Sequence, residues 1–180
     1  RVNADSDPDS NSKRYADGYS YRDSDAGSFA YFDRSRNEPW SYTDGSCAGE
    51  GRQIQFVVSG VTGPISDIRV SFTGTHPYVG DLDALLIDPG NTAGEYLFTF
   101  TGNDMTPQFG DSSDLNGTYT FFDSAPNNWW TAAASVDGIT AIAPGNYKPS
   151  NASGAIVSLD GAFANVNPNG VWILKVNDCF

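Results

Sequence analysis

The sequence predicts an all-β fold, an antiparallel, jelly-roll-like β-sandwich preceded by an extended N-terminal arm. Three observations lead to this prediction. From residue 51 onward, short runs rich in β-branched and aromatic residues are separated by Gly, Pro, Asn and Asp, which commonly bound strands. No segment keeps a helical period of apolar residues over several turns. The spacing of the runs is typical of sandwiches and jelly rolls.

The first runs alternate between apolar and polar residues, as strands with one buried face do. RQIQFVVSG and ISDIRVSFTG both show this period, whereas LDALLID is apolar on both faces in its second half and is expected to be a central strand. EYLFTFTG and GTYTFFD follow, then a loop-rich stretch over 124–153, and AIVSL and VWILKVND close the chain. The predicted core consists of Ile54, Phe56, Val58, Ile68, Val70, Phe72, Leu86, Trp172, Leu174 and Val176.

The chain divides near residue 45. Residues 1–45 contain no Ile or Leu and a single Val, too few aliphatic side chains to form a core of their own. Their one strand-like segment is GSFAYFD, residues 27–33. We therefore expect an extended arm over 1–45 and a sandwich domain over 46–180.

The charge excludes several classes of partner. The formal net charge is −12, from 22 acidic and ten basic residues. Such a surface repels nucleic acids and anionic membranes, whose binding depends on clustered basic side chains. It suits cation binding or a salty extracellular medium. No apolar run approaches the roughly 20 residues of a membrane-spanning helix, and the lack of a signal peptide decides little because such a segment is removed on secretion.

The cysteines and the sequons bear on the compartment. In a secreted chain Cys47 and Cys179 would form one disulfide that closes nearly the whole domain and stabilises it by about 4–5 kcal/mol in the chain-entropy model. In a cytosolic chain they would be two unrelated thiols. Two Asn-x-Ser/Thr sequons, at Asn116 and Asn151, and the acidic composition favour a secreted, glycosylated protein.

Several separated motifs, in order, are similar to those of a known family. ISDIRVSFTGTHPYVGDLDALLIDPGN is followed by GTYTFFDSA, GNYKPSN, LDGAF and NPNGVWILKVND, together covering about residues 52–178. They resemble the P domain (P/Homo B domain), the β-sandwich that follows the catalytic domain in furin- and kexin-like convertases and in many bacterial secreted proteases. The resemblance implies a jelly-roll-like sandwich without catalytic activity of its own. Such a domain stabilises a neighbouring protease or serves as a module in other extracellular proteins, in some members with bound calcium.

The sequence departs from this family at both ends. Nothing in it resembles a subtilisin-like catalytic domain, so protease activity is not implied. Family members continue past the W-x-L-x-V-x-D strand into one more strand, whereas this sequence stops at Phe180. The family topology places Cys47 and Cys179 at the sandwich perimeter, and we predict that they are bonded.

A sandwich that lacks its last strand has open edges, which invite the addition of a strand. We expect SFAYF of the arm to fill an edge, either of its own sandwich or, preferably, of an adjacent subunit. The contact would bury Phe29 and Tyr31 or, on the other face, Ala30 and Phe32. Head-to-tail filling between subunits would build an open filament if the arrangement does not close.

The least ordinary stretch is HPYVGDLDALLIDPG, residues 76–90, which holds the one histidine of the chain. A Ser-His-Asp triad needs a histidine that is held by an acid and faces an activated serine. No Gly-x-Ser-x-Gly elbow is present to expose such a serine, so His76 is predicted to be structural. One histidine and two distant cysteines also cannot form a typical zinc site.

Calcium is the one cofactor that the composition favours, because it takes six to eight oxygen ligands. Asp81 and Asp83 are expected on one side of an extended strand, and a sandwich could bring further acids to the same rim, namely Asp104, Asp111, Asp114 and Asp123. The alternative is a solvated, turn-forming rim. A second acidic run, DSDPDSNS at 5–12, begins like a calcium loop but has Ser10 and Ala16 where the loop needs Gly and Glu, so it is read as a disordered acidic arm.

The aromatic residues suggest another alternative. NNWW places Trp129 and Trp130 side by side in a loop-rich region, with Trp40 on the arm, and exposed tryptophans of β-sandwiches can stack on sugars. Otherwise one ring fills the core and its neighbour covers it.

Three classes of function therefore remain. The preferred one is a non-catalytic extracellular structural subunit that assembles with itself or with a host protein. The others are a detached P domain that stabilises a subtilisin-like secreted protease, and a carbohydrate-binding module.

Overall fold

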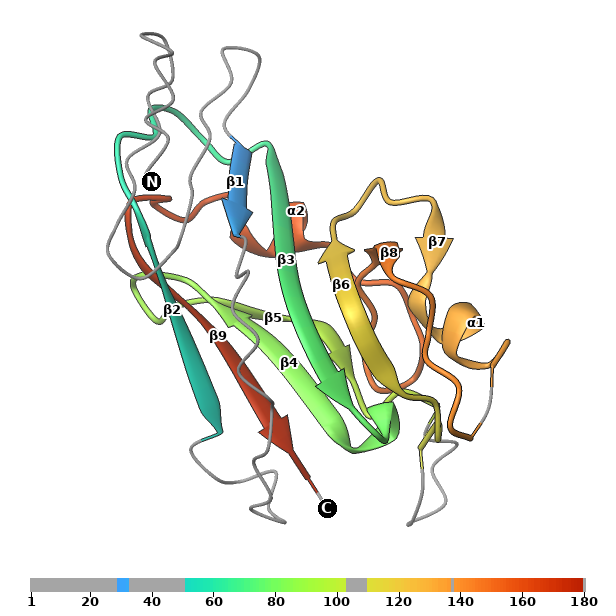
Figure 1. The fold of residues 1–180 in the computed structure, drawn as a ribbon. Coiled ribbons are helices and arrows are strands. Elements are labelled where there is room, and N and C mark those ends of the chain that lie inside the picture. Colours follow the sequence, from blue (N-terminus) through green and yellow to red (C-terminus); the bar gives the residue numbers. More distant parts are fainter. Residues whose placement is uncertain (1–28, 33–50, 103–109, 137, 180) are drawn as a thin grey trace, which may run out of the picture.

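The protein is a sandwich of two β-sheets, shown as a ribbon in Figure 1. The computed structural model describes residues 29–32, 51–102, 110–136 and 138–179. The strands are β1 (Phe29–Phe32), β2 (Arg52–Val58), β3 (Asp67–His76), β4 (Leu82–Ile87), β5 (Gly94–Thr99), β6 (Leu115–Phe121), β7 (Asn127–Asn128), β8 (Gly145–Lys148) and β9 (Gly170–Asp178). The helices are the 3-10 turn η1 (Val79–Asp81) and the short α1 (Trp129–Ala133) and α2 (Leu159–Phe163). The predicted all-β sandwich is confirmed.

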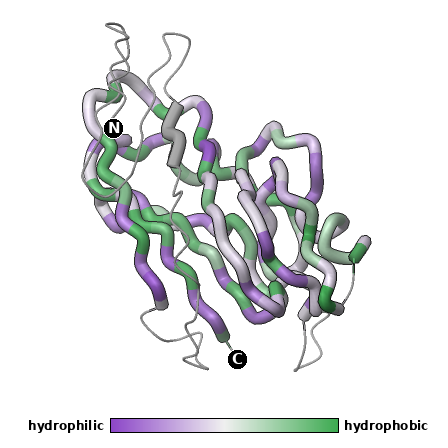
Figure 2. The backbone as a smooth tube through the Cα atoms, in the orientation of Figure 1, coloured by the Kyte–Doolittle hydropathy of each residue, from purple (hydrophilic) through white to green (hydrophobic). Residues whose placement is uncertain are grey.

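The first sheet has four strands in the order β2-β9-β4-β5, and every neighbouring pair is antiparallel. Along β2 and most of β9 buried residues alternate with more exposed ones, because one face meets the core and the other does not. Figure 2 shows that both strands carry hydrophobic and hydrophilic residues. β4 lies between β9 and β5, which confirms that LDALLID is a central strand.

The second sheet has five strands in the order β1-β3-β6-β8-β7. Only the β3–β6 pair is antiparallel; β1 runs parallel to β3, and β8 runs parallel to both β6 and β7. The expectation of a wholly antiparallel sandwich was therefore wrong for this sheet. Residue alternation reports which face of a strand is buried but not the direction of its neighbour, so these pairings left no signal in the sequence.

The core lies between the sheets and is rich in aromatic side chains. All ten predicted core residues are buried, each with at most 4% of its surface exposed. Rings from both sheets and from α1 contact one another with centroids 5.0–6.2 Å apart, in a cluster of Phe72, Phe98, Tyr119, Phe121 and Trp129. The pairs are stacked, tilted or edge-on, and aromatic pairs in offset-stacked and edge-on arrangements stabilise beyond the area that they bury.

The loop-rich stretch 124–153 contains more structure than expected, and AIVSL is not a strand. β7, α1 and β8 lie in the former, and in the latter the backbone forms an isolated bridge at Ile156 before α2 begins. Each α-helix has five residues, too few for an apolar period to show. The start of each helix is instead fixed by an N-cap residue. The Asn128 side chain accepts a hydrogen bond from the Thr131 N–H, and the Ser158 side chain accepts one from the Gly161 N–H.

The strand expected in the arm is present as β1. It lies at one edge of the five-stranded sheet, where Phe29 is opposite Asp67 and Phe32 is opposite Val70. Within this single chain, FAYF of the predicted segment therefore pairs with its own sandwich. The rest of the predicted arm lies outside the described residues.

Candidate functional site

The candidate site is the corner where β3 ends and β4 begins. β3 ends at His76, and the chain turns through η1 before β4 starts at Leu82. The turn packs on the segment after residue 109: a Cβ atom on Gly80 would lie 2.6 Å from the Cα atom of Gly110, so only glycine permits this approach. Asp81 belongs to the 3-10 turn and not to the strand. The expectation that Asp81 and Asp83 share one strand face was therefore wrong, because the strand period starts one residue after Asp81.

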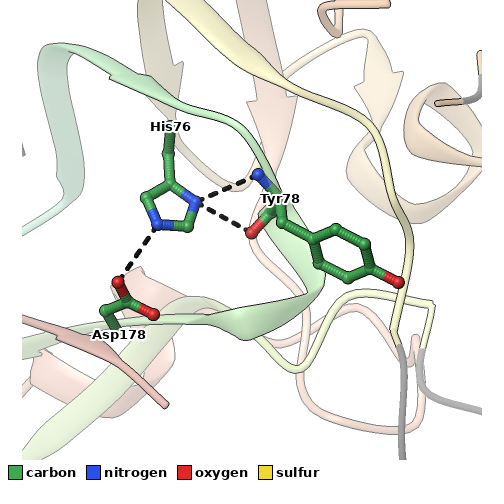
Figure 3. A network of polar contacts seen from close by, with 3 residues as sticks. All are labelled: His76, Tyr78 and Asp178. Atoms are coloured by element: carbon green, nitrogen blue, oxygen red, sulfur yellow. Dashed lines mark hydrogen bonds and ion pairs between the residues drawn. The ribbon is translucent and has the colours of Figure 1, made fainter. Parts of the chain in front are cut away.

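His76 joins the two sheets at this corner (Figure 3). It is 9% exposed, and its Nδ1 atom lies 2.9 Å from the Tyr78 carbonyl oxygen and 3.2 Å from the Tyr78 backbone nitrogen. Its Nε2 atom lies 3.3 Å from Oδ2 of Asp178, the last residue of β9 in the other sheet. Nδ1 can donate to the carbonyl when protonated or accept from the N–H when not, so either form keeps a partner. His76 thus has the geometry of a clasp between the sheets.

Asp81 adds negative charge beside the clasp. Burial raises the pKa of Asp81, the charge of Asp178 raises it further, and His76 acts in the opposite direction. The backbone N–H of Cys179 donates to the Asp81 carbonyl oxygen over 2.8 Å, so this turn also holds the chain immediately after β9. The His76–Asp178 contact therefore has a further carboxylate, that of Asp81, close enough to act on it electrostatically.

Asp83 points to the outer side of the four-stranded sheet and has different neighbours. It accepts a short hydrogen bond from the Thr99 hydroxyl, and its Oδ2 atom lies 3.9 Å from the sulfur of Cys179. It is 5% exposed, and burial raises its pKa, although hydrogen bonds from Thr99 and from the Phe100 backbone act in the opposite direction. Asn177, paired opposite Asp83, is 8% exposed, and its Oδ1 atom has no hydrogen-bond partner among the residues that the structure describes.

The six acids expected to bind calcium do not form one group. Asp111 is close to the corner, since its carbonyl accepts from the Gly80 N–H, and Asp114 lies directly before β6. Asp123 is at the other end of β3, where its carboxylate accepts hydrogen bonds from Ser158 and Leu159 at the start of α2. Its place at the shared rim was therefore predicted wrongly: it caps a helix. Asp104 lies outside the described residues.

Within the described residues, no three His, Cys, Asp or Glu side chains are grouped so that they could hold a metal ion. The described part of the corner thus does not fit the expected ligand set. Calcium binding remains a prediction, which melting curves with and without a chelator would test. The acidic run Asp5, Asp7, Asp9 and Asn11 falls outside the described residues.

The structure describes three of the four residues in the disulfide and sequon predictions. Cys179 is 5% exposed, but Cys47 lies outside the described residues, so the bridge stays a prediction. Asn116 is exposed on β6. The Oδ1 atom of Asn151 instead accepts hydrogen bonds from the backbone N–H groups of Ser153 and Ala155 and from the Ser153 hydroxyl, over 2.8–3.1 Å, within a turn.

The two neighbouring tryptophans, Trp129 and Trp130, differ in burial. Trp129 is fully buried, and its Nε1–H donates to the Thr101 hydroxyl over 2.8 Å, which rules it out as a sugar-stacking platform in this fold. Trp130 is half-buried and lies against Gly154, where a Cβ atom would come within 2.8 Å of the indole ring. Trp40 lies outside the described residues. One ring therefore fills the core and the other covers it.

The sequence prediction missed Asp178 as a partner of His76, although a signal was present. In β9, Trp172, Leu174, Val176 and Asp178 share one strand face by their period of two. An acid that continues a core-facing series needs a partner, because a buried carboxylate without one is costly. The residue that supplies it is 102 positions away, and only the packing of the two sheets identifies it.

No family model, curated protein or solved structure matches this chain. The similarity to the P domain therefore remains a prediction from the motifs. Among the described residues, no helix is long and apolar enough to cross a membrane.

Proposed function

We propose that the protein is a non-catalytic extracellular structural subunit, built on the β-sandwich, that assembles by donating β1 to a neighbouring copy. The observation that carries the proposal is the position of β1. It is a four-residue edge strand whose partner β3 begins 35 residues after β1 ends, and residues 33–50 lie outside the described part of the chain.

Strand donation needs a strand that can leave its sheet without separating other strands, and a connection that is long enough to reach a neighbouring copy. β1 satisfies the first condition, since β3 is its one neighbour in the sheet. The 18 residues over 33–50 can span at most about 60 Å when extended, so the connection does not restrict β1 to its own sandwich. Exchange of an identical element replaces the same contacts with the same contacts and therefore costs little in free energy.

The corner at His76 supports a non-catalytic role. Both ring nitrogens already have protein partners, and the side chain is buried. A general base needs a ring nitrogen that can reach a substrate or a nucleophile. The geometry instead favours a structural function for His76, Tyr78 and Asp178, whose contacts hold the end of β3 to the end of β9.

Two deletions test the proposal. Removing residues 1–35 takes away β1, whereas removing 1–28 keeps it and is the matched control. Assembly is measured by multi-angle light scattering and negative-stain imaging, and folding by circular dichroism. We expect the 1–35 deletion to abolish assembly and leave a folded monomer, and the 1–28 deletion to keep assembly.

Other results would change the functional assignment. Loss of folding in the 1–35 deletion would show that β1 serves its own sandwich. A 1–35 deletion that still assembles would exclude strand donation. A full-length protein that stays monomeric at high concentration would favour the detached protease-stabilising domain.

A further inference from the structure

Four strands bound the two sheets in the described part of the chain, and they differ in how well they are protected from pairing with another chain. β7 has two residues and β1 has four, so both offer short edges. β5 carries a charged residue, Glu95, and a register shift against β4 at Ala84 and Leu85. Short edges, charges and bulges are the usual devices against edge-to-edge association.

β2 is neither short nor bulged, and its one charged residue, Arg52, is at its first position. Its seven residues pair with β9 in an unbroken register from Arg52 to Val58, and they include no proline, glycine or acid. Ile54, Phe56 and Val58 point into the core, and Gln53, Gln55 and Val57 are exposed on the other face. A long, regular edge strand with this composition is a template for a further strand.

The outer face next to this edge is apolar as well. Val57 is 50% exposed and pairs with Val171, which is 42% exposed, and the half-buried Ile173 and Ile87 continue the same face on β9 and β4. These side chains would shield the backbone hydrogen bonds of an added strand from water on that side.

Charge identifies the partner. Residues 46–180 carry 13 acidic and four basic side chains, so two copies of the sandwich repel each other over most of their surfaces. β2 contributes no acid and its one charged residue is Arg52, while β9 adds Lys175, which lies opposite Gln53 on the outer face. The β2 edge is therefore a place where two copies of an acidic chain can meet without opposing carboxylates.

We infer that β2 is a self-pairing edge and that its partner is the β2 strand of a second copy. An antiparallel pair centred on Gln55 would place Ile54 opposite Phe56 on the core-facing side and Gln53 opposite Val57 on the outer side, with no acidic side chain in either pair. The two Arg52 side chains would lie about 20 Å apart at the ends of the pair. The two four-stranded sheets would then join into one continuous sheet across a two-fold axis.

This contact extends the proposed function and is separate from strand donation. β1 belongs to the five-stranded sheet and β2 to the four-stranded sheet, so one chain can make both contacts. A subunit with two different contacts can extend an assembly beyond a dimer.

The first test places a charge on the edge. Gln55→Lys puts two like charges opposite each other at the two-fold axis, and Thr75→Lys puts the same charge on an exposed site of the other sheet as a matched control. In sedimentation velocity of the full chain, we expect Gln55→Lys to weaken association roughly fivefold to tenfold and Thr75→Lys to behave as the wild type. Equal behaviour of the two variants would overturn the inference, and matching melting curves establish that both are folded.

Hydrogen exchange of the wild-type chain gives a second test that does not depend on any variant. We expect the amides of residues 52–58 to exchange more slowly as the protein concentration rises, by about tenfold once dimers predominate. Exchange of 52–58 that stays fast at concentrations where the protein assembles would overturn the β2 contact and leave strand donation standing, because a donated β1 makes the same contacts as β1 in its own sandwich. Equal protection of 52–58 at all concentrations would show that another segment of the same chain covers β2.

Discussion

At the residue scale, the corner at His76 shows how one side chain can connect two sheets. His76 ends a strand of the five-stranded sheet, and Asp178 ends a strand of the four-stranded sheet. Their contact satisfies the imidazole and compensates a carboxylate that is 8% exposed and lies near Asp81. Breaking a buried polar pair costs more than the pair itself contributes, because the remaining group loses both water and partner.

Replacing the histidine should therefore destabilise the fold. We expect His76→Ala to lower the free energy of unfolding by about 1–3 kcal/mol, since Asp178 would remain without the imidazole and close to Asp81. Thr75→Ala, an exposed neighbour on the same strand, should change it by no more than about 0.5 kcal/mol. Urea titration of both variants provides the measurement. Equal effects of the two substitutions would show that the clasp contributes nothing to stability.

The buried carboxylate of Asp83 should make stability depend on pH. Its pKa in the folded protein is raised by burial, so the folded state binds the proton more tightly than the unfolded chain does. The contribution of this group to stability is then full below the unfolded pKa and is lost as the pH rises through the folded pKa.

Asp83→Asn keeps an acceptor for the Thr99 hydroxyl and removes the charge. We therefore expect a higher melting temperature than the wild type at pH 7 and a smaller difference near pH 3. Thermal unfolding at several pH values tests this expectation. A lower melting temperature of the variant at pH 7 would mean that the charged form is required, as it would be for a bound cation.

At the element scale, alternation along the strands determines which residues support the core. In β9, Leu174 is fully buried, and its neighbour Ile173 is half-buried on the opposite face. A shift of one residue in the strand register would exchange these two environments. The same alternation runs along β2, whereas the first half of β4 and the second half of β5 are buried on both faces.

A pair of truncations in β9 tests this arrangement. We expect Leu174→Ala to cost about 2–5 kcal/mol, because it opens a cavity between the sheets. Ile173→Ala removes a side chain of similar size from the outer face and should cost clearly less, since water or a neighbouring chain can replace the contact. Denaturant unfolding of the two proteins under the same conditions gives the difference. Equal costs would contradict the assigned faces of β9.

At the scale of the whole molecule, the predicted disulfide would tie the chain after β9 to the segment before β2. Those two strands are neighbours along the whole of β2, and Cys179 follows β9 directly. Such a bond closes a loop of more than a hundred residues and restricts the unfolded chain accordingly. It would also secure the end of the sheet that includes the proposed β2 edge.

Thiol titration of the unfolded, unreduced protein is the direct measurement. We expect no reactive thiol before reduction and two after it. A melting curve under reducing conditions should shift to lower temperature, in keeping with about 4–5 kcal/mol for a loop of this length. Two reactive thiols without reduction would refute the bond and weaken the assignment to an extracellular compartment.

The sequence by itself determined the fold class, all ten core positions, the central place of β4 and the presence of a strand at SFAYF. Each of these depends on local information, because the alternation of apolar residues with a period of two records which face of a strand is buried. The site was predicted only as a stretch of chain: His76, Asp81 and Asp83 were singled out correctly as unusual, but their neighbours were not.

Tertiary structure decided the rest. The parallel pairings of β1, β7 and β8, the separation of Asp123 from Asp81, and the contact of His76 with Asp178 all join segments far apart in the sequence. Asp81 lies in a 3-10 turn because Gly80 packs against Gly110, which no local pattern records. Local periodicity specifies the face that a residue presents, and only the packing of the two sheets specifies what that face meets.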